Sequence, residues 1–227
     1  SRLYVAFLPA LLIGFAADTI GSHCFASTGF WNHEHPMIAE KVAGDPFEDH
    51  LQLSTLAANA MMLQFFVVDM VGSNHPLWTI ACEFWFYVTF GLATLMWISR
   101  GTSRYLALVC ISTMFAVLGV SYPVYLGYWL TGLGVIFIPR WKWLRPEMTL
   151  AIFAAILCTA RVLQSYTDND FGLQVLRNYS VAASFAFVIA SFRGRSYSFM
   201  EKIARPNRFL ADFSYSLYLL HFPLMLL

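Results

Sequence analysis

Seven long apolar runs are the feature that most constrains how this chain can fold. A helix needs about 20 residues to cross a hydrocarbon core of about 30 Å, and each run approaches or exceeds that length. Lipid offers no partners to backbone polar groups, and the runs show no strand alternation, so we predict that they form helices. They cover residues 3–20, 76–98, 104–121, 124–139, 147–164, 175–191 and 209–227.

The amino-acid composition indicates that a bilayer is the solvent for most of the chain. Only 12% of the 227 residues are charged and 59% are hydrophobic, whereas about 25% of an ordinary soluble domain is charged. So little polar surface cannot cover a water-soluble globule of this size, and the sequence predicts an integral membrane protein. The net charge of +1 argues against a nucleic-acid partner, and four cysteines without CxxC spacing argue against a disulfide framework.

An eighth apolar run, residues 54–71, is short, begins with small polar residues and contains Asp69. Such a run can span, re-enter or lie along the membrane surface. If it does not cross, 11 of the 14 basic residues lie on one side, which the positive-inside rule makes cytoplasmic. We therefore expect a single all-α domain over residues 1–227, a polytopic transmembrane bundle of about seven spans plus one re-entrant or interfacial helix.

Glu83 is the ionisable residue that most needs an explanation, because it lies within an apolar run. A charged group at the centre of a membrane helix costs about 2.5–3.5 kcal/mol on insertion scales. The polar residues 73–75 precede Pro76, which suits a helix cap followed by proline at the first helical position. Glu83 then lies about 10 Å into the helix, with Tyr87 at i+4 on the same face. This spacing fits a structural carboxyl group paired to a histidine or arginine, and it also fits a catalytic one.

The last apolar run carries a second polar stripe. Ser214, Tyr218 and His221 follow one another at spacings of four and three, so they share one helix face. Asp212 lies nine residues before His221, on the opposite face of an unbroken helix. A histidine inside a membrane often donates a hydrogen bond to another helix. Together with a carboxyl group on another helix, it also supplies the two groups that general acid–base catalysis requires.

A histidine-rich loop, residues 21–53, contains the sequence HEHP at 33–36. This is not the HExxH pattern of a helical zinc site, and no cysteine or aspartate pattern supports a metal. We therefore predict no metal centre.

Two segments resemble signatures of the membrane-bound acyltransferase 3 family. The segment from Pro76 to Tyr87 is similar to PLW(S/T)(L/I)xxExx(F/W)Y, and the segment from Phe213 to Pro223 is similar to SYSLYLxHxP. The opening SRLYVAFLPALL is a weaker match to a basic RxxRxxP pattern, because Arg2 is one residue out of register with it.

The resemblance implies a ten-helix membrane enzyme that transfers an acyl group, commonly acetyl, from acyl-CoA to a hydroxyl of a carbohydrate or another surface or secondary-metabolite acceptor. It also implies a histidine in a first helix. We therefore expect the chain to be a fragment that lacks the first two helices and part of the C-terminal end, and that is inactive alone. The expected location is the cytoplasmic (inner) membrane, with the lipid bilayer and a carbohydrate or lipid-linked acceptor as partners.

From the chemistry that acyl transfer requires, we also predict roles for residues of this sequence. The predicted site comprises the catalytic residues Glu83 and His221, the substrate-binding residues Asn74, Trp78, Tyr87 and Tyr218, and the cofactor-binding residue Arg2, which would bind CoA phosphates. The alternative is a proton-coupled transporter or flippase-like protein, in which Glu83, Asp212 and His221 relay protons. An inverted repeat would favour this alternative, and none stands out in the sequence.

Overall fold

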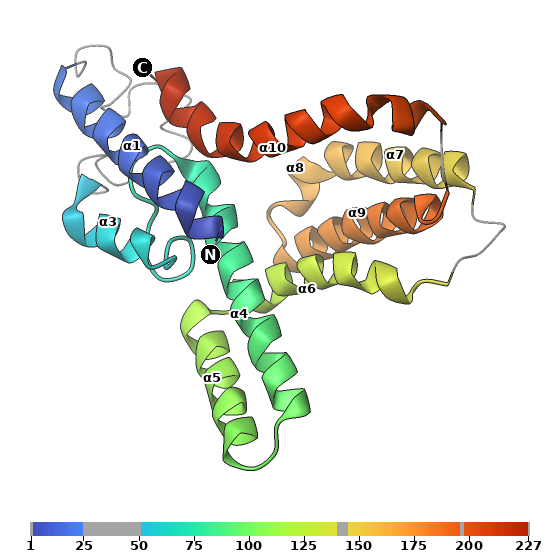
Figure 1. Ribbon diagram of the computed structural model, residues 1–227, viewed down its shortest axis with the longest axis horizontal. Helices are drawn as coiled ribbons and strands as arrows, with labels where there is room; N and C mark the ends of the chain where they lie inside the picture. Colours follow the sequence, from blue (N-terminus) through green and yellow to red (C-terminus); the bar gives the residue numbers. More distant parts are fainter. Residues whose placement is uncertain (1, 25–50, 140–144, 196–197, 227) are drawn as a thin grey trace. The chain divides into compact units, whose positions relative to one another are not determined.

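The chain is all-helical wherever the structure describes it. The computed structural model describes residues 2–24, 51–139, 145–195 and 198–226 (Figure 1). Within these ranges β-type pairing is limited to one isolated bridge between Gln64 and Val68. The α-helices are α1 (Arg2–Cys24), α3 (Leu53–Ala60), α4 (Trp78–Ile98), α5 (Thr102–Leu118), α6 (Ser121–Gly134), α7 (Pro146–Val162), α8 (Gln164–Thr167), α9 (Phe171–Phe192) and α10 (Ser198–Leu226), with 3-10 turns η3 (His75–Leu77) and η4 (Val135–Phe137).

Three helical segments of the described chain are long and apolar enough to cross a membrane. They are Leu3–Cys24, His75–Ile98 and Phe171–Phe192, and the broken pair of α5 with Ser121–Phe137 adds a fourth if it forms one bent span. Each of the seven apolar runs contains helix, as predicted, but the described structure supports three or four spans rather than seven. One reason is length, because α7 has 17 residues and therefore extends over only about 26 Å.

The run of residues 54–71 does not form a spanning helix. Helix α3 ends at Ala60 after 8 residues, a length of only about 12 Å. The buried Asn59 then holds the following chain in a folded loop, because its Nδ2 donates to the Asp69 carbonyl (2.9 Å) and its Oδ1 accepts from the Val71 amide (3.1 Å). This conformation is incompatible with a continuous crossing helix, and it agrees with the non-crossing segment that the charge distribution favoured.

The chain divides into two compact units, which are described separately. Unit 1 comprises residues 1–119 and 203–227, and unit 2 comprises residues 120–202. In unit 1, α3 and the beginning of α4 pack beside α1 (Figure 1). The buried core of this unit is contributed by α1, by the loop before α4, by α4 itself and by the end of α10, and it comprises Phe7, Ala10, Leu11, Met62, Val71, Leu77, Ile80, Ala81 and Leu219.

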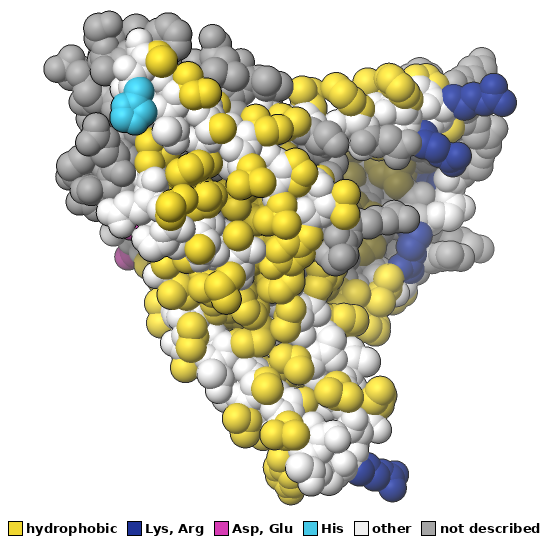
Figure 2. Space-filling model, turned by 60° about the vertical axis from the view of Figure 1, so that its left-hand side comes forward, with side chains coloured by type: hydrophobic (Ala, Val, Ile, Leu, Met, Phe, Trp, Pro, Cys, Tyr) yellow, Lys and Arg dark blue, Asp and Glu magenta, His cyan; other side chains and the backbone are white. Residues whose placement is uncertain are grey.

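The surface of the described residues is rich in large apolar side chains. Trp97 is 88% exposed and Val5 is 76% exposed, although both are hydrophobic. On the face that Figure 2 shows, hydrophobic side chains predominate and charged ones are sparse. A surface of this kind is stable against lipid and costly in water, which agrees with an integral membrane protein.

In unit 2, α9 packs against both α7 and α6. Gly127 of α6 lies so close to α9 that a Cβ atom built on it would be 1.7 Å from the Tyr179 hydroxyl oxygen. That hydroxyl donates to the Val124 carbonyl at 3.4 Å, and the Tyr179 ring meets the Tyr128 ring at a centroid distance of 4.5 Å. The absence of a side chain at Gly127 therefore makes room for an aromatic contact between the two helices.

We expect Gly127→Ala to lower the stability of the protein by about 1–3 kcal/mol, the usual effect of overpacking. Thermal unfolding in detergent measures this change. Tyr179→Phe removes the nearest clashing atom, so the double variant should recover part of the loss. Equal stability of Gly127→Ala and the wild type would contradict this account of the close approach.

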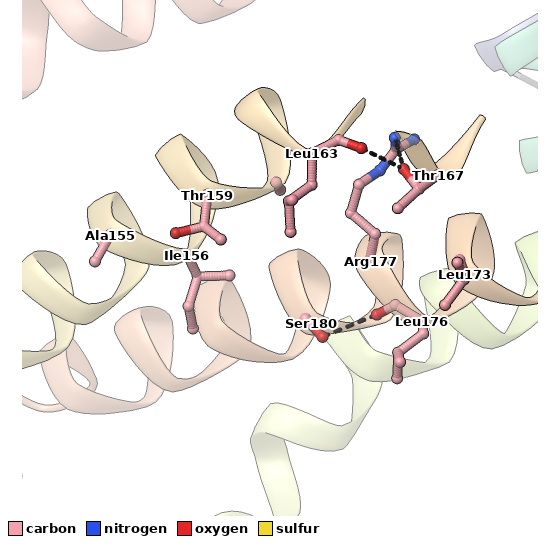
Figure 3. A pocket seen from close by; sticks show the side chains of 10 residues that line it. Ala155, Ile156, Thr159, Leu163, Thr167, Leu173, Leu176, Arg177 and Ser180 are labelled. Carbon is pink, nitrogen blue, oxygen red and sulfur yellow. Dashed lines mark hydrogen bonds between the residues drawn. The ribbon is translucent and has the colours of Figure 1, made fainter. Parts of the chain in front are cut away.

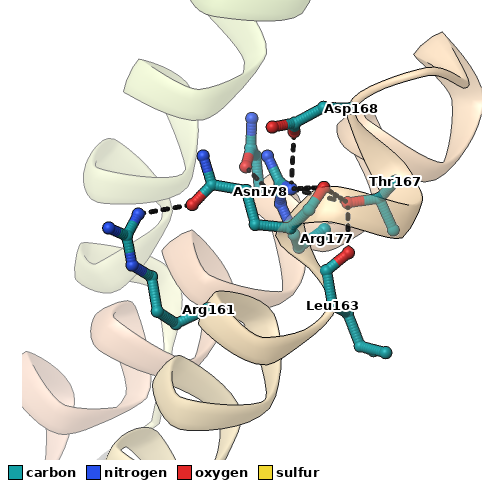
Figure 4. A network of polar contacts seen from close by, with 7 residues as sticks. Arg161, Leu163, Thr167, Asp168, Arg177 and Asn178 are labelled. Atoms are coloured by element: carbon teal, nitrogen blue, oxygen red, sulfur yellow. Dashed lines mark hydrogen bonds and ion pairs between the residues drawn. The ribbon is translucent and has the colours of Figure 1, made fainter.

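A polar network joins the end of α8 to α9 (Figure 4). The Arg177 guanidinium forms an ion pair with Asp168 at 2.8 Å and also donates to the Thr167 hydroxyl and to the Gln164 carbonyl. Arg161 donates to the Gln164 side chain. The hydrogen bond from Arg177 is the main cause that lowers the pKa of Asp168 below its ordinary value of 3.8.

The lowered pKa of Asp168 predicts a pH dependence of stability. A carboxyl group with a depressed folded-state pKa contributes stability above its unfolded pKa and loses that contribution as the pH falls through its folded value. We therefore expect Asp168→Asn to reduce the loss of stability below about pH 4. Unfolding temperatures measured across this range test the expectation, and identical acid profiles of variant and wild type would contradict it.

Candidate functional site

The two signature segments meet in unit 1, where the beginning of α4 contacts the end of α10. The Tyr218 hydroxyl donates to the Pro76 carbonyl at 3.2 Å and lies 3.1 Å from the Thr79 hydroxyl oxygen. Nearby, the Asn74 side-chain amide donates to the Leu219 carbonyl at 3.0 Å. These hydrogen bonds bring together residues that are about 140 positions apart, so the fold places both signatures at one site.

Helical structure begins at His75, one residue before the predicted start at Pro76, and α4 itself begins at Trp78. Pro76 occupies the first turn of η3, which leads directly into α4, and Asn74 stands at the N-cap position. However, the Asn74 side chain makes no capping bond and reaches across to Leu219 instead. Asn74 is only 2% exposed, and in an apolar interior its amide group stabilises the fold more by pairing with another helix than by capping its own.

Glu83 lies on α4 one helical turn after Thr79. Its carboxyl oxygen Oε1 accepts a hydrogen bond of 2.7 Å from the Tyr87 hydroxyl, which confirms that the two residues share a helix face. Within the described part of the chain, its hydrogen-bond partner is this tyrosine rather than a histidine or an arginine. Glu83 is only partly buried.

Three polar side chains therefore form a row along α4. Thr79, Glu83 and Tyr87 are four residues apart, and Tyr218 of α10 joins the row at Thr79. A carboxyl group flanked by hydroxyl groups can accept a proton, and it can also orient a hydroxyl group of a bound molecule. We call these four residues the α4 row.

Trp78 has a different environment from the α4 row. Its ring packs against the ring of Phe65 at a centroid distance of 4.8 Å, and it is only partly exposed. In the next turns of α4, Trp85 donates from its indole Nε1 to the Met62 carbonyl at 2.7 Å. Both tryptophans thus hold the folded loop before α4, and the predicted substrate contact of Trp78 stays a prediction.

Several predicted residues have side chains outside the described part of the structure. Arg2 begins α1, and Asp212 and His221 lie within α10, but only their backbones are described. His221 follows Tyr218 by three residues in the same helix, which places the two on the same side of α10. The catalytic role of His221 and the cofactor-binding role of Arg2 stay predictions.

Asp18 is the site residue that the sequence analysis missed. It is 0% exposed, and both carboxyl oxygens accept hydrogen bonds from Ser73: Oδ2 from the backbone amide and Oδ1 from the hydroxyl group, each at 2.7 Å. A usable signal was present, because an acidic residue within the first apolar run is as costly as Glu83 in the second.

The described residues contain no group of three His, Cys, Asp or Glu side chains that could hold a metal ion. The HEHP sequence at 33–36 lies outside the described residues. The absence of a metal centre therefore stays a prediction.

A cavity of about 420 Å³ lies in unit 2, between α7 and α9 (Figure 3). It contains none of the predicted site residues and is lined mainly by apolar side chains. The Arg177 guanidinium near it is already paired with Asp168. The lining residues are Ala155, Ile156, Thr159, Ala160, Leu163, Thr167, Leu173, Leu176, Arg177 and Ser180.

The helices and the α4 row define a polytopic membrane protein with a carboxyl group inside one of its candidate spans. The acyltransferase 3 family, described as an acyltransferase domain, has a model that matches residues 1–227. The chain belongs to this family, which confirms the resemblance of the two signature segments. No curated protein matches the chain, and no solved structure matches it.

We expect Asn74→Ala to destabilise the protein by about 1–3 kcal/mol, because it leaves the buried Leu219 carbonyl without its donor. Tyr218→Phe removes a hydrogen bond at a side chain that is 39% exposed, so its effect should be smaller. Thermal unfolding of both variants in detergent gives the comparison. The reverse order of the two effects would contradict the assignment of Asn74 as the stronger link between α4 and α10.

Proposed function

We propose that this protein is a membrane O-acyltransferase that moves an acyl group, most simply acetyl, from acyl-CoA to a hydroxyl of a carbohydrate or another surface or secondary-metabolite acceptor. Membership of the acyltransferase 3 family supports a membrane acyltransferase. The observation that carries the proposal is the α4 row, in which the Glu83 carboxyl group accepts from the Tyr87 hydroxyl one helical turn after the paired hydroxyl groups of Thr79 and Tyr218.

The proposed chemistry begins with the acceptor hydroxyl, which is a poor nucleophile until a base takes its proton. The hydroxyl oxygen then attacks the thioester carbonyl, and negative charge develops on the carbonyl oxygen. Collapse of this intermediate forms the ester and breaks the carbon–sulfur bond, and the departing CoA thiolate takes up the proton that the base removed from the acceptor, so that CoA leaves as its thiol. Every step therefore requires one group that handles protons and at least one hydrogen-bond donor near the carbonyl.

The α4 row can supply these groups. Glu83 either holds the acceptor hydroxyl or orients the histidine that is expected in a preceding helix. Tyr218 can donate a hydrogen bond, and His221 follows it on the same side of α10. Asn74 and Trp78 would shape the pocket around the acceptor. The Glu83 carboxyl group is already oriented by Tyr87 at 2.7 Å, which reduces the reorganisation needed during the reaction.

The basic residues of the chain are the basis for the proposed binding of the acyl-CoA donor and for the proposed side of the membrane. CoA carries phosphates, and Arg2 together with basic residues of the cytoplasmic loops could bind them. We propose that the donor binds at the cytoplasmic face of the inner membrane, with the bilayer as the surrounding medium. The acceptor is a carbohydrate or lipid-linked molecule that reaches the same site.

Glu83→Gln tests the proposed function, because it keeps the volume of the side chain and removes its charge. We expect acyl transfer by the full-length protein to fall by about 100-fold or more, the usual contribution of a positioned acid or base. Glu147→Gln is the matched control, since Glu147 is an exposed acid in the first turn of α7. The measurement is the release of CoA from acetyl-CoA in membranes supplied with candidate sugars.

Undiminished activity of Glu83→Gln would overturn the role of Glu83. Wild-type membranes that release no CoA with any hydroxyl acceptor, yet show proton-dependent transport, would favour the transporter alternative. In that case Glu83 would carry protons rather than orient a nucleophile.

A further inference from the structure

We infer that Asp18 is a positioning residue: through Ser73 it fixes the turn that begins the Glu83 helix, and it thereby sets the geometry of the α4 row. The part of this inference that concerns catalysis rests on the proposed acyl transfer. The part that concerns the geometry of α4 does not.

The contact between Asp18 and Ser73 pairs both oxygens of a buried carboxyl group in unit 1. Both carboxyl oxygens are engaged at 2.7 Å, one with the Ser73 amide and one with its hydroxyl group. The side chain is 0% exposed. An acidic residue in an apolar helix is costly unless it is fully hydrogen-bonded, so this helix position is occupied by an acid because Ser73 lies against it.

Gly72 permits the close approach between Asp18 and the turn that contains Ser73. Its φ angle is +62°, and a Cβ atom built on it would lie 2.0 Å from the Asp18 Oδ2 atom. A left-handed conformation at this position favours glycine, and any side chain would also displace the carboxyl group. Helix α1 and the turn of residues 72–74 therefore approach each other to a distance that only glycine permits.

The turn of residues 72–74, which Asp18 holds, is also bonded to the candidate site. Asn74 directly follows Ser73, and its side chain donates to the Leu219 carbonyl of α10 at 3.0 Å. Two residues later the Pro76 carbonyl accepts from Tyr218. The start of α4 is thus held on one side by α1 and on the other by α10, and Glu83 follows on the same rigid helix.

A direct chemical role for Asp18 does not fit this geometry. Both of its oxygens accept hydrogen bonds from Ser73, and it is buried from solvent. Its effect on acyl transfer must therefore pass through α4. A displacement of about 1 Å at a reacting group can cost about 100-fold in rate, so a loosened turn has a measurable consequence.

Cys82 provides a reporter that does not depend on activity. It is buried and directly precedes Glu83, whereas Cys24, Cys110 and Cys158 are exposed. In the full-length protein with every other cysteine replaced, the rate at which N-ethylmaleimide modifies Cys82 measures how firmly the first turns of α4 are held. The kcat and KM for acetyl-CoA are measured in the same membranes.

The informative variants are Asp18→Ala, Asp18→Asn and Ser73→Ala. We expect Asp18→Ala and Ser73→Ala to raise the Cys82 modification rate by about tenfold and to lower kcat by a similar factor with little change in KM, the effect of losing a hydrogen bond to a carboxyl group. Asp18→Asn should stay close to the wild type. Its carbonyl oxygen can accept from the Ser73 amide while its NH₂ group donates to the Ser73 hydroxyl oxygen.

Asp69→Ala is the control, because Asp69 is an exposed acid in the same unit. It should leave the modification rate of Cys82 unchanged. If Asp18→Ala does not fold, Ser73→Ala carries the test alone, since it removes one of the two hydrogen bonds and keeps the other.

Each remaining outcome has a definite meaning. Unchanged Cys82 modification in Ser73→Ala would overturn the inference. Faster Cys82 modification in Asp18→Asn, together with an unchanged rate in Ser73→Ala, would show that the charge of Asp18 matters rather than its hydrogen bonds. This result would also overturn the inference. Faster Cys82 modification in a protein whose wild type transfers no acyl group would uphold the positioning of α4 and reject the proposed function.

Discussion

Unit 1 depends on the hydrogen bonds by which a polar segment of the chain, residues 72–79, is held between apolar helices. Inside a bilayer no water is available, so buried donors and acceptors must find partners in the protein. The Asp18 carboxyl group provides them on one side, and the Leu219 carbonyl and Tyr218 hydroxyl provide them on the other. These few bonds fix α1, the start of α4 and the end of α10 with respect to one another.

The same constraint accounts for the character of the candidate site. A carboxyl group is useful for proton transfer only where it is held in place and partly removed from water. Glu83 meets both conditions, because Tyr87 orients it at 2.7 Å and the beginning of its helix is anchored by hydrogen bonds to two other helices. The hydrogen bonds of this polar segment therefore hold the start of α4 in place. Membership of the acyltransferase 3 family supports a membrane acyltransferase.

Much of the fold and part of the site could be predicted from the sequence, for reasons that are local. Every apolar run contains helix, since a helix is the simplest way to satisfy the backbone in lipid. The shared face of Glu83 and Tyr87 followed from the helical period alone. The seven spans were not confirmed in the described residues, because apolar character was counted without the length of the resulting helix, as α7 shows. The partners of Asn74 and Asp18 were not foreseen.

The sequence by itself determined the helical class, the membrane environment, the family and the spacing along α4, since all of these depend on composition or on residues within a few helical turns. Only the tertiary structure decided which polar groups pair across the core. Asp18 meets Ser73 over 55 residues of chain, and Asn74 meets Leu219 over 145. Such partners are selected by packing and by the cost of leaving a buried polar group unsatisfied, and no periodicity along the chain encodes that choice.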